Sequence, residues 1–360
     1  MTISVRKLLA FSAVVAVCAA PALAQQRPTQ PAQRQAQPAP AQPAQANRSL
    51  VVVRLSYASG WDALPAIVGI ERGFFSNEGL VVSGMPVSSG LAVIRSIGVG
   101  STDFAAVPQR IFLTLAGANV EAKAVAVAGW GTEMEVIVPT AATNIRSLAD
   151  LKGKTIALGS GSDAHPTLIR LLNAAKMRPT DVKLAILEPV DLTSVFEKKL
   201  ADAVIESRHF TEVLRATNQG RVLLSNEQIT STLGRIDAKA LVVRNGMIAT
   251  EPDTVQRVVN AWVRSLAYIQ QDPRDAARLM TIFFHRQGVV VQPQQAEQWV
   301  TFTKYNRYVW GQGEIADAEY NGWGLITGQL LKQVPKLGPF IENRFAEAAV
   351  RNLQTARAGN

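Results

Sequence analysis

One segment of the sequence combines features that suit the binding of an anion. Residues 159–166 (GSGSDAHP) lie between a short apolar run, 155–158, and an apolar-periodic run, 166–176, which predict a strand and a helix. Glycines and serines at this point leave backbone amides free at the start of the helix. Because a helix N-terminus carries about half a positive charge, the turn can hold a carboxylate, a sulfonate or a nitrate.

Four residues of this turn are candidate ligand contacts: Ser160, Gly161, Ser162 and His165. Asp163 has two open interpretations. Its carboxylate can cap the helix that follows, which would weaken anion binding, or it can shape the ligand site. For His165, the alternative to a ligand contact is a surface position at the start of the helix.

Polar and aromatic side chains also follow the strands expected in the first half of the chain. Ligands of open parallel sheets bind beyond the carboxyl ends of the strands, so these positions are expected to line a site. Hydroxyl and amide groups can hydrogen-bond a ligand there, and aromatic rings can cover an organic group. Alternative roles are hydrophobic packing for Trp61 and helix capping for Ser89. The candidates are Ser56, Tyr57, Trp61, Ser89, Pro108, Gln109, Trp130, Gly131 and Thr132.

Two glutamates end strands that are expected in the second half. Glu188 follows the apolar run 183–187, and Glu206 follows 203–205. Two carboxylates in one site would disfavour a simple anion and favour a ligand with donor groups, such as an amine, an amide or a heterocyclic N–H. The alternative is that either glutamate pairs with Arg208 or a lysine. For Arg110, solvent exposure is preferred over pairing with an anion.

The remaining reactive residue types give no further site. His209 and His285 have no metal-ligand spacing, and Cys18 is the only cysteine. The sequence therefore predicts no metal, no cofactor and no cysteine nucleophile.

The elements that must position these residues alternate between strand and helix. In the first half, strands are expected at 50–57, 81–87, 104–107 and 120–128, with helices at 63–72, 91–97 and from 111 onward. The second half repeats the rhythm, with strands at 155–158, 183–187 and 203–205 and helices at 166–176 and 192–200. A strand at 240–244 and a mostly helical remainder follow. This order predicts an α/β fold with mostly parallel sheets.

The two halves contain a weak repeat. Asp103 and Asp202 occupy equivalent positions, each just before a short strand, and each is expected to bond backbone amides at its turn.

The N-terminus reads as an export signal and not as part of the fold. Arg6 and Lys7 precede an apolar stretch, 8–20, and a small-residue cleavage site, so residues 1–24 are expected to be a signal peptide. Residues 25–49 are nearly all Gln, Pro and Ala, which predicts a disordered tether. Five of the excess positive charges, out of a net charge of +9, lie in the first 49 residues. No basic stripe remains for nucleic acid.

Three short segments resemble a known family. Residues 73–80 (GFFSNEGL) look like its G-x-F-x-x-x-G-L signature, and 147–154 (SLADLKGK) are similar to the start of its second domain. Residues 241–244 with 251–255 resemble its return strand and helix. Over about residues 50–285, the chain resembles the periplasmic solute-binding proteins of the nitrate/sulfonate/taurine ABC-importer family, within the alkanesulfonate-binding-like and thiamine-pyrimidine-binding-like superfamily. It departs at Lys199, where that family has glycine, and at 203–209, where alkanesulfonate binders tend to have an aromatic residue.

The resemblance implies a two-lobed periplasmic binding protein of type II. Each lobe would be a mostly parallel sheet flanked by helices, and two crossing strands, near 135–139 and 239–243, would join the lobes. Lobe 1 is expected to comprise 50–137 and 239–345, lobe 2 to comprise 138–238, and 346–360 to form a C-terminal tail. The ligand would lie in the cleft between the lobes.

The function implied is non-catalytic. The expectation is a monomeric periplasmic component of an ABC importer that binds a small polar or anionic organic solute and delivers it to a cognate permease and ATPase in the inner membrane. One alternative is a periplasmic sensor of the same fold. Another is an enzyme like the thiamine-pyrimidine synthases, which the export signal and the lack of a cysteine-rich motif disfavour.

Overall fold

The computed structural model describes residues 50–58, 61–87, 90–131, 134–159, 162–187, 189–233, 237–288, 290–327 and 331–358. The expected signal peptide, 1–24, and tether, 25–49, lie outside the described residues. Within those ranges, no helix has the length and the apolar character to span a bilayer. Five candidate site residues also lie outside: Ser89, Thr132, Ser160, Gly161 and Glu188.

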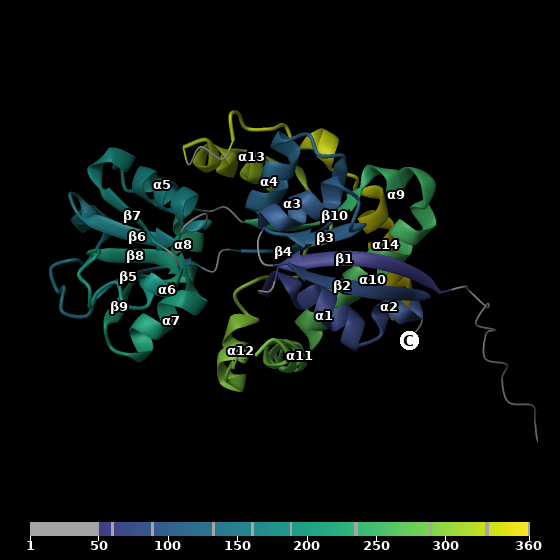
Figure 1. The fold of residues 1–360 in the computed structure, drawn as a ribbon, viewed down its shortest axis with the longest axis horizontal. Coiled ribbons are helices and arrows are strands. Elements are labelled where there is room, and N and C mark those ends of the chain that lie inside the picture. Colours follow the sequence, from purple (N-terminus) through teal and green to yellow (C-terminus); the bar gives the residue numbers. More distant parts are fainter. Residues whose placement is uncertain are drawn as a thin grey trace, which may run out of the picture. The chain divides into compact units, whose positions relative to one another are not determined.

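The first sheet has five strands in the order β2-β1-β3-β10-β4 (Figure 1). β1 runs parallel to β2 and β3, whereas β10 runs antiparallel to both of its neighbours, β3 and β4. The sheet is thus mixed, with one reversed strand that comes from late in the chain. The strands are β1 (Val51–Ala58), β2 (Leu80–Val87), β3 (Phe104–Val107), β4 (Ala122–Trp130) and β10 (Ala238–Arg244).

Helices cover both faces of this sheet. Phe104 and Ala106 of β3 belong to a core beneath α1, α10 and α11, whereas Ala105 and Val107 belong to a second core beneath α3 and α4. Successive strand side chains point to opposite faces, so a fully apolar run requires cover on both. The helices are α1 (Leu64–Glu71), α2 (Phe74–Asn77), α3 (Gly90–Gly98), α4 (Gln109–Gly117), α9 (Asn245–Thr250), α10 (Pro252–Gln271), α11 (Pro273–Arg286), α12 (Pro293–Trp299), α13 (Gln312–Thr327) and α14 (Arg344–Ala358), with the 3-10 turns η1 (Trp61–Ala63) and η4 (Gly338–Phe340).

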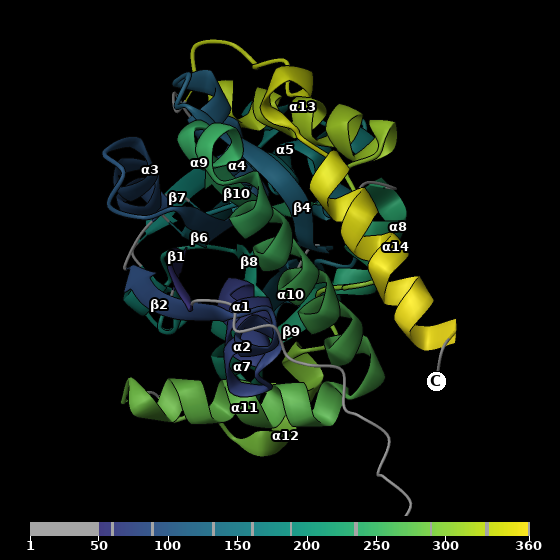
Figure 2. The ribbon, with the colours of Figure 1, turned by 90° about the vertical axis from the view of Figure 1, so that its right-hand side faces the viewer.

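The last helix belongs to this packing. Figure 2 shows α14 alongside α10, and the two helices are in contact. Phe345, Ala346 and Ala349 are buried in the core that α10 also covers. The expected C-terminal tail from residue 346 therefore includes most of a packed helix.

The second sheet repeats the order of the first, as β7-β6-β8-β5-β9. β6 runs parallel to β7 and β8, and β5 runs antiparallel to β8 and β9. The expected boundary between residues 137 and 138 falls inside β5. The elements are β5 (Met134–Pro139), β6 (Thr155–Gly159), β7 (Lys183–Leu187), β8 (Ala203–Ser207), β9 (Gly220–Leu224), α5 (Ala164–Ala174), α6 (Pro189–Leu192), α7 (Arg208–Ala216) and α8 (Asn226–Leu233), with the turns η2 (Leu148–Leu151) and η3 (Pro179–Asp181).

Both repeated aspartates accept backbone N–H groups, as expected, but from the neighbouring strand and not from their own turn. The Asp103 carboxylate accepts the backbone N–H of Arg54 at 3.1 Å, and Asp202 accepts that of Thr155 at 2.8 Å. Asp202 thereby fixes the start of β6, whereas Asp103 bonds the middle of β1. Burial acts to raise the pKa of Asp103, but hydrogen bonds from Arg54 and Arg244 outweigh it and hold the pKa below its usual range.

One expected helix is wrong. In place of a helix over 192–200, the structure has α6 followed by turns, in which the N–H of Ser194 bonds the carbonyl of Asp191 three residues back. Lys199 has φ +53°, and a right-handed helix cannot run through that conformation. Glycine adopts it at little cost, which accounts for the glycine found there in the family that the sequence resembles. Three further elements, β9, α7 and α8, have no counterpart among the elements expected from the sequence.

Candidate functional site

The N-termini of α4 and α5, which follow strands of different sheets, are joined by a charge pair. The Nε atom of Arg110 lies 3.4 Å from Oδ1 of Asp163. Arg110, expected to be exposed, has a side chain that is 24% exposed and faces this carboxylate. The two strand ends that the sequence analysis singled out, after β3 and after β6, thus meet.

Asp163 precedes α5 but does not cap it through its side chain. The carboxylate accepts no capping hydrogen bond from the described part of the helix, whereas Ser162 Oγ accepts one from the N–H of Ala164 at 3.2 Å. Of the two open interpretations, the geometry favours a carboxylate that shapes the site. Burial raises the pKa of Asp163 to about 6, with Asp237, Asp62 and Glu206 adding to the rise and Arg110 opposing it.

His165 lies in the first turn of α5. Burial lowers the pKa of its imidazole below the ordinary histidine value of 6.5, so the ring is neutral at neutral pH. A neutral imidazole has one N–H donor and one acceptor nitrogen, so it would hydrogen-bond a ligand without adding charge.

A second polar network links four separate elements. Asn321 of α13 donates from Nδ2 to Gln109 Oε1 (2.5 Å) and to Asp237 Oδ1 (2.6 Å), and its Oδ1 accepts Arg170 Nη1 of α5 (2.6 Å). Arg170 Nη1 also lies 3.9 Å from Asp237 Oδ1. Gln109 is buried, and its Nε2 has no hydrogen-bond partner among the residues that the structure describes. The network holds α13 and α4 against α5.

Of the four members of this network, only Gln109 was among the candidate residues expected from the sequence. Arg170 carried a usable signal, because it is a charged residue inside the apolar-periodic run 166–176. For Asn321 and Asp237, no comparable signal exists, since both lie far along the chain from their partners. Burial raises the pKa of Asp237, while Arg170 and Lys239 lower it.

A third charge pair lies beside β1. Asp62, in η1, is 2.6 Å from the Nζ of Lys239 in β10. Asp62, Asp163 and Asp237 therefore each have a cationic partner. Asp62 and Asp237, together with Glu206, are the acids that raise the pKa of Asp163.

Glu206 is buried at the end of β8 and bonded to the backbone. Its carboxylate accepts the N–H of Gly159 at 2.9 Å and that of Ser207 at 2.8 Å. The alternative pairing with Arg208 is not what the geometry favours, since Arg208 faces Glu135 at 3.4 Å. A Cβ at Gly159 would lie 2.6 Å from Glu206 Oε2, so glycine is needed for this close approach. Glu206 thus fixes the end of β6 at Gly159.

The candidates after β1 differ in their surroundings. Ser56 is buried, and its hydroxyl lies 3.5 Å from the carbonyl of Phe104. The ring of Tyr57 packs edge-on against Phe283 in the hydrophobic core, 6.0 Å between centroids, which favours a structural role. The backbone of Trp61 lies in η1, and its side chain is outside the described part.

The end of β4 carries Trp130 and Gly131. The indole N–H of Trp130 donates to Asn306 Oδ1 at 2.7 Å, and the Arg307 guanidinium lies 4.9 Å from the ring centroid. Gly131 has φ +115°, which favours glycine, and its N–H donates to the carbonyl of Asp237 at 3.2 Å. Pro108 precedes α4, where its carbonyl accepts the first N–H groups of that helix.

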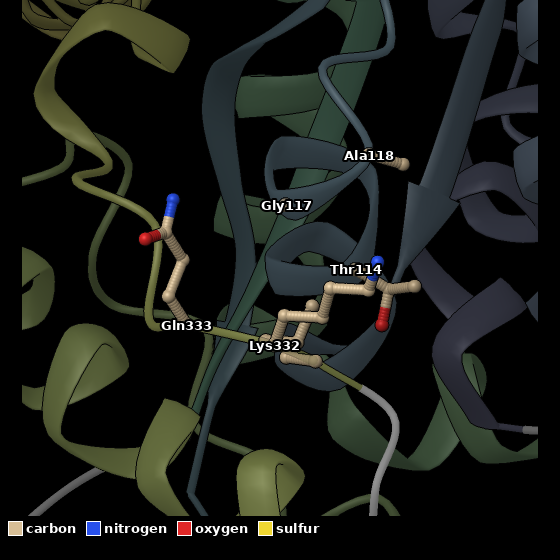
Figure 3. Close-up of a pocket in the computed structure, with 6 residues that line it drawn as sticks. Thr114, Gly117, Ala118, Lys332 and Gln333 are labelled. Carbon is tan, nitrogen blue, oxygen red and sulfur yellow. The ribbon is translucent and has the colours of Figure 1, made fainter.

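A surface pocket lies at the other end of α4 from Gln109 and Arg110 (Figure 3). Its lining comes from the end of α4 and from the segment that follows α13: Thr114, Gly117, Ala118, Leu331, Lys332 and Gln333. None of the candidate residues lines it. Within the described ranges, no cluster of His, Cys, Asp and Glu could hold a metal ion.

The two sheets have the same strand order, and polar side chains lie at the ends of their strands. This arrangement is that of a two-lobed binding protein. The chain is similar to the crystal structure of the periplasmic aliphatic sulphonate binding protein SsuA from Escherichia coli, with a TM-score of 0.70 and 16% identity over 82% of this chain and 93% of that one. It is also similar to the nitrate-binding protein NrtA from Synechocystis, with a TM-score of 0.61, 13% identity, and coverage of 84% and 89%. The expected two-lobed binding-protein fold is confirmed.

An enzyme also has a similar fold. The desulfurization enzyme DSZB is similar to this chain with a TM-score of 0.63 and 15% identity over 84% of this chain and 99% of that one.

Sequence comparison identifies the family. Residues 61–276 match the family described as NMT1/THI5 like, and the chain belongs to it. A binding protein of Brucella abortus is 27% identical over 220 residues, which are 60% of this chain and 66% of the relative, slightly under two thirds of its length. An Escherichia coli protein named for binding aliphatic sulfonates is 31% identical over 125 residues, 34% of this chain and 38% of that protein. The resemblance stated from the sequence is confirmed.

Proposed function

We propose that this protein is the periplasmic solute-binding component of an ABC importer and that it binds a small polar or anionic organic solute between its two sheets. Family membership and relatives named for sulfonate binding support this. The observation that carries the proposal is the meeting of the α4 and α5 N-termini at Arg110 and Asp163. Helix N-termini and a guanidinium are the groups that anions bind.

The ligand contacts form two groups in this proposal. One group follows β3 and β4, and the other lies on the turn between β6 and α5 and at the end of β8. Closure of lobe 2 (138–238) on lobe 1 (50–137 and 239–345) would bring the groups together around the solute. The first group is Pro108, Gln109, Arg110, Trp130, Gly131 and Thr132, and the second is Ser160, Gly161, Ser162, His165 and Glu206.

The proposed protein binds its solute without changing it. The relatives are named binding proteins, and the sole cysteine, Cys18, lies in the expected signal peptide. After incubation with the protein, the mass spectrum of a bound compound is expected to be unchanged. A product peak that grows with time would favour an enzyme of the DSZB kind.

A thermal-shift screen tests the ligand class. The purified chain is incubated with short alkanesulfonates, nitrate, amino-carboxylates and pyrimidines, and the melting temperature is measured for each. A ligand that binds only the folded state raises that temperature by mass action. We expect an organic anion such as a sulfonate to raise it most; if an amine- or amide-bearing compound raises it most instead, the site carboxylates select a ligand with donor groups. If no member of the panel shifts the melting temperature, the proposed solute class is wrong.

A further inference from the structure

The charge pair between Arg110 and Asp163 leaves hydrogen-bonding groups unused. The Nε of Arg110 is buried and donates no hydrogen bond within the described part of the chain, although Oδ1 of Asp163 lies 3.4 Å away. A well-formed pair of guanidinium and carboxylate has N–O distances of about 2.8 Å and is often bidentate. Next to Arg110, the buried Nε2 of Gln109 also has no acceptor among described residues. Two consecutive residues of α4 thus each carry a buried N–H donor that has no hydrogen-bond acceptor among the described residues.

Asp163 is the acid that faces Arg110, and it lies among like charges. Asp62, Asp237 and Glu206 all act on it with like charge, and Arg110 is its one attractive partner among the groups that shift its pKa. Lys239 faces Asp62 and Arg170 faces Asp237, so these cations are engaged elsewhere. His165, on the same helix, is neutral at neutral pH.

We propose that Asp163 is an internal counter-anion, which holds Arg110 while the site is without ligand and is replaced there by the sulfonate or carboxylate of the bound solute. This inference rests on the proposed function. The incoming anion accepts hydrogen bonds from Arg110 and from Gln109 Nε2. The displaced Asp163 loses its cation and gains a further negative neighbour, so its carboxylate takes up a proton from solvent.

Because binding is coupled to proton uptake, the direction in which the affinity changes with pH can be predicted. With Arg110 beside it, Asp163 has a pKa of about 6. Displacement from Arg110 removes the cation that lowers this pKa, so the inference requires a higher pKa in the complex. Anion binding therefore takes up a proton above that pH. The affinity rises as the pH falls from about 8 to about 6, by at most about tenfold per pH unit for one proton, and levels off below.

Calorimetric titration of the purified chain with ethanesulfonate, propionate and nitrate tests this inference. The variants are Asp163→Asn and, as the matched control, Asp253→Asn, which removes the same charge from an aspartate that is 86% exposed on α10. We expect Asp163→Asn to bind the anion at least about fivefold more tightly than wild type near pH 7.5 and to lose most of the pH dependence. Asp253→Asn should behave as wild type.

The outcomes separate the inference from the proposed function. If wild type binds an anion and Asp163→Asn binds it no better with the same pH dependence, the counter-anion role is refuted while the binding function stands. If only Asp163→Asn binds, the inference is supported. If no protein binds any anion of the panel, both fail. Proton uptake, measured for wild type in two buffers of different ionisation enthalpy, needs no variant, and a value of zero near pH 7.5 refutes the inference.

Discussion

Asn321 is the residue whose removal should most weaken the contact between α13 and the second sheet. Its side chain is buried and makes three hydrogen bonds of 2.5–2.6 Å, to Gln109, Asp237 and Arg170. Asn321→Ala would leave these partners buried with fewer hydrogen bonds, and an unpaired buried polar group is costly.

The magnitude follows from the partners. Hydrogen bonds to charged groups contribute about 1.5–3 kcal/mol each, and two of the three are of this kind. Arg170 and Asp237 are 3.9 Å apart and can approach each other once the amide is gone. A net loss of about 3 kcal/mol in the free energy of unfolding is therefore expected, which lowers the melting temperature by about 6 °C in a chain of this size.

Differential scanning calorimetry measures the effect, with Asn352→Ala as the control. Asn352 is exposed on α14 and makes a single 3.3 Å hydrogen bond to Asn260. The control should lower the melting temperature by less than about 1 °C. Equal, small shifts for the two variants would mean that the network contributes little, and the reasoning from its hydrogen bonds would be wrong.

Three further predictions concern the turn after β6. Ser162→Ala combined with His165→Ala should weaken ligand binding at least about tenfold, or 1.4 kcal/mol, by calorimetry, and unchanged affinity would exclude the turn from the site. Gly159→Ala should destabilise the fold by about 1–3 kcal/mol in urea unfolding, because the added Cβ meets Glu206 Oε2 at 2.6 Å; full tolerance would contradict that packing. Since the folded-state pKa of Asp163, about 6, exceeds the ordinary 3.8, its stabilising contribution is present at low pH and is lost as the pH rises toward 6. The melting temperature of Asp163→Asn should thus gain on wild type between about pH 4.5 and pH 7, and parallel profiles would contradict it.

The strands could be predicted because a strand that is buried on both faces of a sheet consists of consecutive apolar residues, and such a run is visible in the sequence. The run FAAV at 104–107 is apolar throughout, and the structure buries every member in one of two cores. The repeated aspartates could be predicted to bond backbone amides, but the amides that they bond, those of Arg54 and Thr155, lie 49 and 47 positions away on neighbouring strands. The periodicity of apolar residues was thus enough to predict the fold class and the order of most elements.

The helices and contacts that escaped prediction depend on partners distant in sequence. α7 begins at Arg208 and carries Glu212 and Arg215, so it reads as a polar segment. In the fold, Arg208 and Arg215 face the buried Glu135. Of the apolar side chains of α7, Leu214 is buried in a core of the second sheet, whereas Val213 is 40% exposed. Burial removes water from the Glu135 carboxylate and raises its pKa, while the two arginines act to lower that pKa.

The pairing of Arg110 with Asp163 was missed for the same reason. Each residue was placed correctly at the end of a strand, but the sequence does not say which strand ends of the two sheets approach each other. The polar network around Asn321 likewise joins residues that are 151 and 212 positions apart. Tertiary geometry decides such contacts, and no local pattern encodes them.

The position of β10 has a consequence for how the chain acquires its structure during synthesis. This strand lies in the middle of the first sheet, between β3 and β4, yet it follows the whole second sheet in sequence. On a ribosome, β3 and β4 therefore emerge more than a hundred residues before the strand that joins them, whereas all five strands of the second sheet are contiguous in sequence. The second sheet can complete itself first, and until residues 238–244 appear, the first sheet remains two unjoined pieces with open edges that are prone to aggregate.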